Sequence, residues 1–245
     1  MLRTLRGVIE GNLDRRMELM HKLMTSRDLA KISCKACNGC GECCHGMDDT
    51  IHLDPYDIFM LTGNLKKSFS DLVNVRVGLR VENGLVLPYL LMRGENVCCT
   101  FLRDDGRCGI HPFRPGFCRL FPLGREYDGK TLRYFVTDGG CNIPGKTKVR
   151  IDRYLEIPDL KRYEAFVTTW HYFKKSLEEF LYDKQDAELN QRIALFILEM
   201  FYERPYNTDG DFYVQFDRRL RLAEDALSDL SLARETWRGI RVSDS

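Results

Sequence analysis

Apolar residues follow a helical spacing at both ends of the chain and alternate with polar residues in its middle. Spacings of three and four are typical of an amphipathic helix, and they predict one helix in the N-terminal segment, from Leu2 to Met24. The same spacing predicts helices at residues 159–184, 187–203 and 211–237, with polar or Pro- and Gly-containing joints between them. Both ends of the chain are therefore expected to be helical.

Two short helices are predicted in the middle of the chain by their start signals. Asp54 precedes Pro55, a favourable helix start because Asp caps free amides and Pro suits the first turn. Gly63 predicts the end of this helix. Ser68 and Asp71 have the spacing of a capping box, which predicts a second, short helix directly after it.

Two hairpins are predicted beside these helices. Apolar residues alternate with polar ones or Gly over residues 75–81, and Asn83–Gly84 then supplies a tight turn into the second strand. Pro88 has no amide hydrogen, so that strand should have a free edge there. A weaker hairpin signal spans residues 125–136. We therefore expect an α+β fold, mainly helical, with small antiparallel hairpins in its middle.

Composition and charge narrow the class of protein. Hydrophobic residues make up 44% and charged residues 30% of the chain, so it has enough apolar material for a substantial core. The formal net charge of +1 gives no general attraction to nucleic acid or to an anionic membrane. The charged N-terminal segment lacks the apolar run of a signal peptide, and no window approaches the roughly 20 apolar residues of a membrane span. We therefore expect a cytosolic protein.

All ten cysteines lie between Cys34 and Cys141. Thiols stay reduced in the cytosol, so such a cluster favours metal binding over disulfides. The densest stretch reads CKACNGCGECC, residues 34–44, in which a spacing of two residues lets a loop direct several thiolates at one ion or cluster. The distribution predicts an N-terminal helix, a cysteine-cluster metal-binding domain and a C-terminal helical annex, at residues 1–33, 34–146 and 147–245.

Four short motifs follow one another through the cysteine-containing region. They read CNGCGECC at 37–44, CTFLRDDGRCGIH at 99–111, RPGFCRLFP at 114–122 and GC at 140–141. Their order and spacing resemble the YkgJ-type cysteine-cluster family of zinc- or iron-chelating domains. The resemblance implies that eight cysteines bind metal: Cys37, Cys40, Cys43, Cys44, Cys99, Cys108, Cys118 and Cys141. Cys34 and Cys98 depart from the family signature, and whether they are ligands is left open.

The sequence leaves the metal open between zinc and an iron-sulfur centre. Four thiolates around a tetrahedral ion suit zinc, and the C-x2-C-x2-C spacing that begins at Cys34 is also typical of iron-sulfur ligation. No catalytic residue is identified, and whether the chain is an enzyme is left open. The expected function is that of a cytosolic metal-binding protein whose clustered thiolates chelate zinc or an iron-sulfur centre.

Two arginines and three histidines near the cysteines have alternative roles. They are Arg114, Arg119, His45, His52 and His111. The arginines flank Cys118 and would either stabilise thiolate charge or pair with the acidic loop at 104–105. The first two histidines are candidates to replace a cysteine ligand. The third is expected to pack, because it stands where the family often carries Tyr.

Two other functions compete with metal binding alone. Residues 140–147, GCNIPGKT, match the letters of a phosphate-binding loop, but the helical pattern after them lacks the parallel sheet that nucleotide hydrolysis needs. Cysteine-cluster families also include proteins similar to flagellin lysine N-methylases, so a cluster-dependent protein lysine N-methyltransferase is the alternative, although no S-adenosylmethionine loop is recognisable. We expect a metal ion as partner, with a protein partner at the C-terminal helices as an open hypothesis, and neither nucleic acid nor a membrane.

Overall fold

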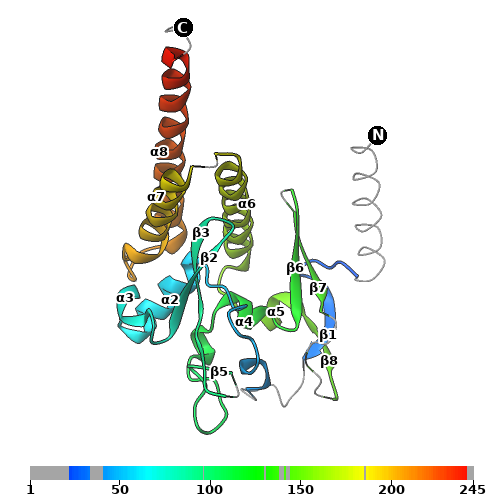
Figure 1. The fold of residues 1–245 in the computed structure, drawn as a ribbon. Coiled ribbons are helices and arrows are strands. Elements are labelled where there is room, and N and C mark those ends of the chain that lie inside the picture. Colours follow the sequence, from blue (N-terminus) through cyan, green and yellow to red (C-terminus); the bar gives the residue numbers. More distant parts are fainter. Residues whose placement is uncertain are drawn as a thin grey trace, which may run out of the picture. The chain divides into compact units, whose positions relative to one another are not determined.

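The computed structural model describes residues 22–33, 41–95, 97–129, 131–137, 141, 144–184 and 186–241. Helices dominate these residues, and their strands form four two-stranded antiparallel sheets (Figure 1). The architecture is therefore α+β and mainly helical with small antiparallel hairpins, as the sequence predicts. Most of the helix predicted from Leu2 to Met24 lies outside the described residues.

The chain divides into two compact units. Unit 1 contains residues 1–51 and 92–174, and unit 2 contains residues 52–91 and 175–245. In unit 1 the elements are β1 (Leu29–Ser33), η2 (Glu42–Cys44), β4 (Met92–Arg93), β5 (Cys98–Cys99), η3 (His111–Phe113), α4 (Gly116–Leu120), β6 (Leu123–Asp128), β7 (Thr131–Val136), β8 (Thr147–Arg150) and α5 (Ile151–Leu155). In unit 2 they are α2 (Pro55–Leu65), α3 (Phe69–Leu72), β2 (Val77–Glu82), β3 (Leu85–Leu90), α7 (Ala187–Leu198), η4 (Glu199–Glu203) and α8 (Phe212–Arg241). α6 (Leu160–Lys184) supplies residues to both.

The β6–β7 hairpin of unit 1 packs against α6 through its aromatic side chains. Tyr134 is buried, and its hydroxyl donates a hydrogen bond of 2.9 Å to Oε1 of Glu164. Tyr127 stacks on His171, with ring centroids 4.0 Å apart. Met24 pairs with Tyr134 through two backbone hydrogen bonds of 2.8 Å, so it does not end a helix as the spacing predicts. This residue joins the hairpin instead.

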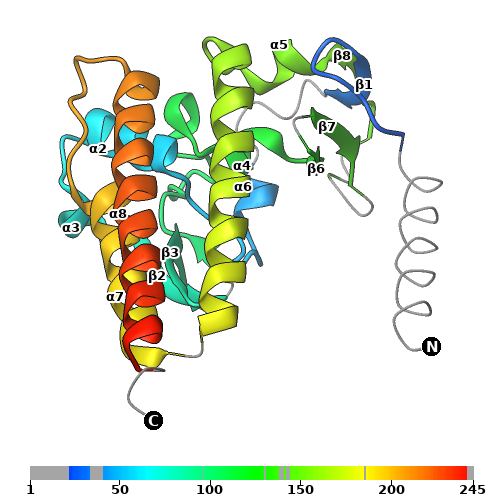
Figure 2. The ribbon, with the colours of Figure 1, turned by 90° about the horizontal axis from the view of Figure 1, so that it is seen from above.

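A long-range ladder, which the sequence analysis did not predict, joins β1 to β8. The two strands are antiparallel, and their register pairs Leu29 with Arg150 and Ser33 with Thr147. Figure 2 shows this ladder beside the β6–β7 hairpin within unit 1. Ser33 directly precedes the first cysteine, and Thr147 follows the last one by six residues. The ladder therefore closes the segment that contains all ten cysteines.

In unit 2 the local start and turn signals lead to the predicted elements. α2 and α3 both begin with a capping box, formed by Asp54 with Asp57 and by Ser68 with Asp71. Asn83 and Gly84 both have positive φ and form the turn of the β2–β3 hairpin.

The helix end predicted at Gly63 is wrong, because α2 continues to Leu65 and Lys66 adopts the left-handed cap. Gly63 instead lies close to Thr208, whose Cγ2 is 3.0 Å from the position a Cβ would take. Its small size therefore serves packing. α7, which follows in this unit, packs against β3. Along the described part of the chain, none of the helices combines the length and apolar character required to cross a bilayer.

Candidate metal centre

The first half of the candidate centre is a single tight turn that ends in two adjacent cysteines. Gly41 has a φ of 74° and starts the 3-10 helix η2, which is closed by a 2.8 Å hydrogen bond from the amide of Cys44 to the carbonyl of Gly41. Cys43 is exposed and Cys44 is half-buried. The predicted ligands Cys37 and Cys40, and the open case Cys34, lie outside the described residues.

The second half is a loop that returns Cys108 towards Cys99. Leu102 and Cys108 form an antiparallel bridge, and the amide of Gly109 donates a 2.9 Å hydrogen bond to the carbonyl of Phe101. Residues Asp104, Asp105 and Gly106 form the turn, in which Gly106 has a φ of 75°, a conformation that glycine adopts readily. Cys99 is buried and Cys108 is half-buried.

These two halves are packed together through backbone contacts. A Cβ placed on Gly41 would lie 2.3 Å from the carbonyl oxygen of Gly106 and 3.1 Å from Cδ1 of Leu102. The amide of Gly46 donates a 3.0 Å hydrogen bond to the carbonyl of Val97. The turn before Cys43 and the loop before Cys108 are thus held against each other, although they are far apart in the sequence.

Four thiols interact where the two halves meet. The Cys44 thiol forms hydrogen bonds with both Cys43 and Cys108, which lowers the pKa of Cys43 to about 7 and the pKa of Cys108 to about 6. The same two hydrogen bonds raise the pKa of Cys44, so this thiol holds its proton and acts as the donor. Burial raises the pKa of Cys99, and the charges of Cys108 and Cys43 add to that effect. The region therefore stabilises two thiolates beside two thiols.

Arg114 and Arg103 add positive charge near these thiolates. The guanidinium of Arg114 lowers the pKa of both Cys43 and Cys108, and Arg103 contributes to the lowering at Cys108. Nη2 of Arg103 also lies 3.1 Å from Oδ2 of Asp105, so the acidic loop pairs with this arginine. The sequence analysis considered Arg114 for this electrostatic role but missed Arg103, whose position just before the acidic pair was the available signal.

Arg119 has a structural role that neither sequence interpretation included. Its side chain is 7% exposed, and its guanidinium donates hydrogen bonds of 3.0, 3.1 and 2.5 Å to the carbonyl oxygens of Arg114, Glu156 and Pro112. These contacts join η3 and the start of α4 to the end of α5. The residue therefore stabilises the backbone around Cys118 through its fork-shaped set of donors.

The histidines occupy three different environments. Nδ1 of His45 lies 3.2 Å from Sγ of Cys98, within unit 1. His52 belongs to unit 2, where its Nδ1 lies 3.3 Å from Oε2 of Glu82. Nε2 of His111 forms a hydrogen bond with Nη1 of Arg114. Burial and the charge of Arg114 lower the pKa of His111, so this imidazole is held neutral as an acceptor.

The other predicted ligands are only partly placed. Cys118 is half-buried in α4, and Cys141 is half-buried with residues on both sides outside the described ones. Within the described ranges, no group of three or more His, Cys, Asp or Glu side chains is arranged to hold a metal ion as it stands. The eight-cysteine ligand set therefore stays a prediction, supported at Cys43, Cys44, Cys99 and Cys108 by the mutual effects of their thiols.

The segment with the letters of a phosphate-binding loop continues into a different structure. Residues 144–146 are followed by β8, which pairs with β1 in an antiparallel ladder, and then by the short helix α5. A nucleotide-binding loop needs a parallel sheet before it and a helix directly after it. The described part of this segment therefore gives no support to nucleotide hydrolysis.

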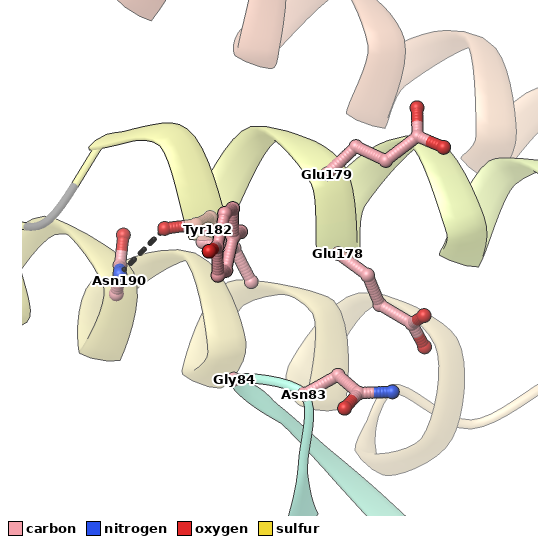
Figure 3. A pocket seen from close by; sticks show the side chains of 7 residues that line it. Asn83, Gly84, Glu178, Glu179, Tyr182 and Asn190 are labelled. Carbon is pink, nitrogen blue, oxygen red and sulfur yellow. Dashed lines mark hydrogen bonds between the residues drawn. The ribbon is translucent and has the colours of Figure 1, made fainter. Parts of the chain in front are cut away.

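A hollow in unit 2 is chemically unlike the cysteine region. It has a volume of about 660 Å³ and is lined by Asn83, Gly84, Glu178, Glu179, Leu181, Tyr182 and Asn190 (Figure 3). Nδ2 of Asn190 donates a 3.1 Å hydrogen bond to the carbonyl of Leu181. No cysteine lines this hollow, so the candidate chemistry stays with the thiols of unit 1.

One family model matches the cysteine-containing segment. Residues 36–142 match the family model CxxCxxCC, described as a putative zinc- or iron-chelating domain. No curated protein and no solved structure matches the chain significantly. The matched segment contains the turn at 41–44, the loop at 99–108 and helix α4.

Proposed function

We propose that this chain is a cytosolic metal-binding protein whose clustered thiolates hold zinc or an iron-sulfur centre, because residues 36–142 match the model of a putative zinc- or iron-chelating domain. The observation that supports it best is that the Cys44 thiol interacts with both Cys43 and Cys108. Two segments that are distant in the sequence thus bring their thiols together at one place. A set of soft sulfur donors suits zinc and iron-sulfur clusters better than magnesium or calcium.

The described donors fit the chemistry of such a group. Metal ions bind the thiolate form of cysteine, and the hydrogen bond from Cys44 lowers the pKa of Cys108 to about 6. Bound metal would supply a crosslink between the turn at 41–44 and the loop at 99–108. Because such a crosslink forms only in the folded chain, its binding free energy contributes to folding stability.

The first experiment determines which metal the protein holds. The full chain is purified under anaerobic conditions and analysed for zinc, iron and acid-labile sulfide, together with its absorption spectrum. Iron with sulfide and a broad band near roughly 400 nm supports an iron-sulfur centre. Zinc without sulfide supports a thiolate zinc site. A chain that contains neither and takes up neither would refute the proposal.

Substitutions then test whether the described thiols are responsible. Cys44→Ser and Cys108→Ser are each expected to lower metal content and thermal stability together, because each removes a thiol from the group. His52→Asn is the control, since this histidine belongs to unit 2 and pairs with Glu82, and its metal content should be unchanged. Full metal retention in both test variants would exclude these thiols as ligands.

The lysine N-methyltransferase alternative stays a prediction from the sequence resemblance. Binding of S-adenosylmethionine to the metal-loaded chain, measured by calorimetry, is the experiment that discriminates it. Saturable binding would favour methyl transfer, whereas no binding by the fully loaded protein would count against it.

A further inference from the structure

Cys98 and His45 are two neighbouring side chains of metal-binding type, in addition to the four interacting thiols. Sγ of Cys98 lies 3.2 Å from Nδ1 of His45. His45 is exposed and Cys98 is half-buried, whereas the adjacent Cys99 is 7% exposed. Neither residue belongs to the eight-cysteine pattern. The pair is therefore a cluster of ligating side chains that the proposed site does not use.

The backbone fixes the relative position of the two donors. His45 and Cys98 form an antiparallel bridge, and the amide of Gly46 donates a 3.0 Å hydrogen bond to the carbonyl of Val97. Val97 itself has a φ of 47°, which is rare for a β-branched residue. The two side chains thus start from paired backbone positions, so a ligand held by both needs little further ordering of the chain.

Strand geometry separates this pair from the buried thiols. Successive side chains of a strand point to opposite faces, so Cys98 and Cys99 of β5 lie on opposite sides of it. Cys99 is 7% exposed and lies on the buried side. Cys98 is on the other side, with His45. One two-residue strand therefore presents a sulfur donor to each face.

The distance between the donors fits the edge of a tetrahedral site. A zinc ion bound to sulfur at about 2.3 Å and to nitrogen at about 2.0 Å with a tetrahedral angle places the two donors about 3.5 Å apart. The observed 3.2 Å is a few tenths of an ångström shorter. A small opening of the two side chains would therefore admit one ion between them.

We propose that Cys98 and His45 form an open, two-ligand site for a thiophilic divalent ion such as Zn²⁺, separate from the buried thiols of unit 1. The inference rests on the proposed metal-binding function. Binding replaces the S–H bond of Cys98 with a metal–sulfur bond and releases the proton to solvent, while His45 donates the lone pair of Nδ1. Two coordination positions remain for water or for a ligand of an incoming carrier.

The test measures zinc stoichiometry and release in the full chain. Zn²⁺ is titrated by equilibrium dialysis, Co²⁺ is used as a spectroscopic substitute, and the release of zinc to a colorimetric chelator is followed in time. The variants are Cys98→Ser and His45→Asn, which keep groups able to hydrogen-bond each other but replace the sulfur or the imidazole. His52→Asn is the matched control, a histidine of unit 2 paired with Glu82.

The wild type and the His52 control should bind one ion more than either test variant, and that ion should leave to the chelator in a fast phase. Each test variant should lose the fast phase and keep the tightly bound ion, because the four interacting thiols are unchanged. The double variant should have the same zinc stoichiometry and the same release kinetics as either single variant.

Unchanged stoichiometry and release in both variants, with a metal-loaded wild type, would show that the pair is a structural hydrogen bond only. That outcome overturns the inference and leaves the proposed function intact. A wild type that binds no metal at any site would instead overturn both. Because the two substitutions are at different residues, misfolding of one still leaves the other to decide.

Discussion

Gly41 lies directly against the backbone of Gly106. A Cβ at position 41 would be 2.3 Å from the carbonyl oxygen of Gly106, closer than real Cβ atoms approach. The contact joins the turn that contains Cys43 and Cys44 to the loop that contains Cys108. Glycine is therefore required at position 41 by close packing as well as by its φ of 74°.

Gly41→Ala is expected to separate the two halves of the metal centre. Positive φ alone costs Ala about 1 kcal/mol, and the collision with a backbone oxygen should add at least about 2 kcal/mol, because backbone has to move to relieve it. Metal content should fall together with the free energy of unfolding, since the thiols no longer meet. Metal analysis and urea unfolding measure the two effects.

Gly94→Ala is the matched control for this variant. Gly94 has the same φ of 74°, but nothing lies within 4 Å of a Cβ built there. Gly94→Ala should lose only the stability that a positive φ costs Ala, and its metal content should be unchanged. If Gly41→Ala were no worse than Gly94→Ala, the packing of Gly41 on Gly106 would not be what joins the two halves.

Local signals in the sequence were sufficient for most of unit 2. The capping boxes at Asp54 and Ser68 and the turn at Asn83–Gly84 act within four residues, so their outcome depends little on the rest of the fold. Gly63 shows the limit of this reasoning. It was interpreted as a helix end, but contact with Thr208, far along the chain, is what the glycine permits.

The candidate site was less accessible from sequence because its geometry depends on long-range contacts. Spacing and family resemblance predict cysteines as ligands, but neither shows that the thiol of Cys44 interacts with both Cys43 and Cys108. The β1–β8 ladder was missed because a strand of five residues has little periodicity, and its partner is more than a hundred residues away. The role of Arg119 depends on three carbonyl groups from separate turns, which no local pattern encodes.

Arg119→Lys is expected to destabilise unit 1 although the charge is kept. Lys presents a compact ammonium group and cannot reproduce three divergent donors, so buried carbonyls lose their partners. A loss of about 2–4 kcal/mol is expected, because hydrogen bonds to charged donors are worth about 1.5–3 kcal/mol each. Chemical denaturation of the metal-free chain measures it without contribution from the ion.

Arg150→Lys provides the comparison for this substitution. Arg150 pairs with Asp152 at the surface, where its side chain is 47% exposed, and exposed ion pairs contribute less than about 1 kcal/mol. Equal losses of unfolding free energy in the two variants would mean that the buried carbonyl contacts of Arg119 stabilise the fold no more than an exposed ion pair does.

Asp71 predicts a pH-dependent contribution to the stability of unit 2. Hydrogen bonds from the side chain and then the backbone amide of Ser68 hold the pKa of Asp71 below its ordinary value of 3.8. A lowered folded-state pKa means that the stabilisation is fully present above 3.8 and is lost as the pH falls through the folded value. Asp71→Asn should therefore be less stable than the wild type at neutral pH, and the difference should shrink in acid.

Urea midpoints at neutral pH and below about pH 3 measure this change. Asp225→Asn, at an exposed position of α8, is the control and should show no comparable narrowing. A deficit of Asp71→Asn that stays constant over the whole range would mean that the amide replaces the carboxylate contacts poorly for reasons of shape and not of charge.

Metal removal is expected to loosen unit 1 selectively. All described cysteines, including the four interacting thiols, belong to unit 1, whereas α7 and β3 pack against each other within unit 2. A chelator should therefore increase backbone hydrogen exchange at residues 41–46 and 97–109, where the turn and the loop lose their crosslink. Exchange in α7, residues 187–198, should stay as slow as before. Mass spectrometry of peptides from both regions measures the two rates in one sample, and Cys108→Ser without chelator should reproduce the pattern. Equally faster exchange in both units would show that the metal stabilises the whole chain as one cooperative structure. Unchanged exchange at 97–109 would show that the described thiols do not bind the metal.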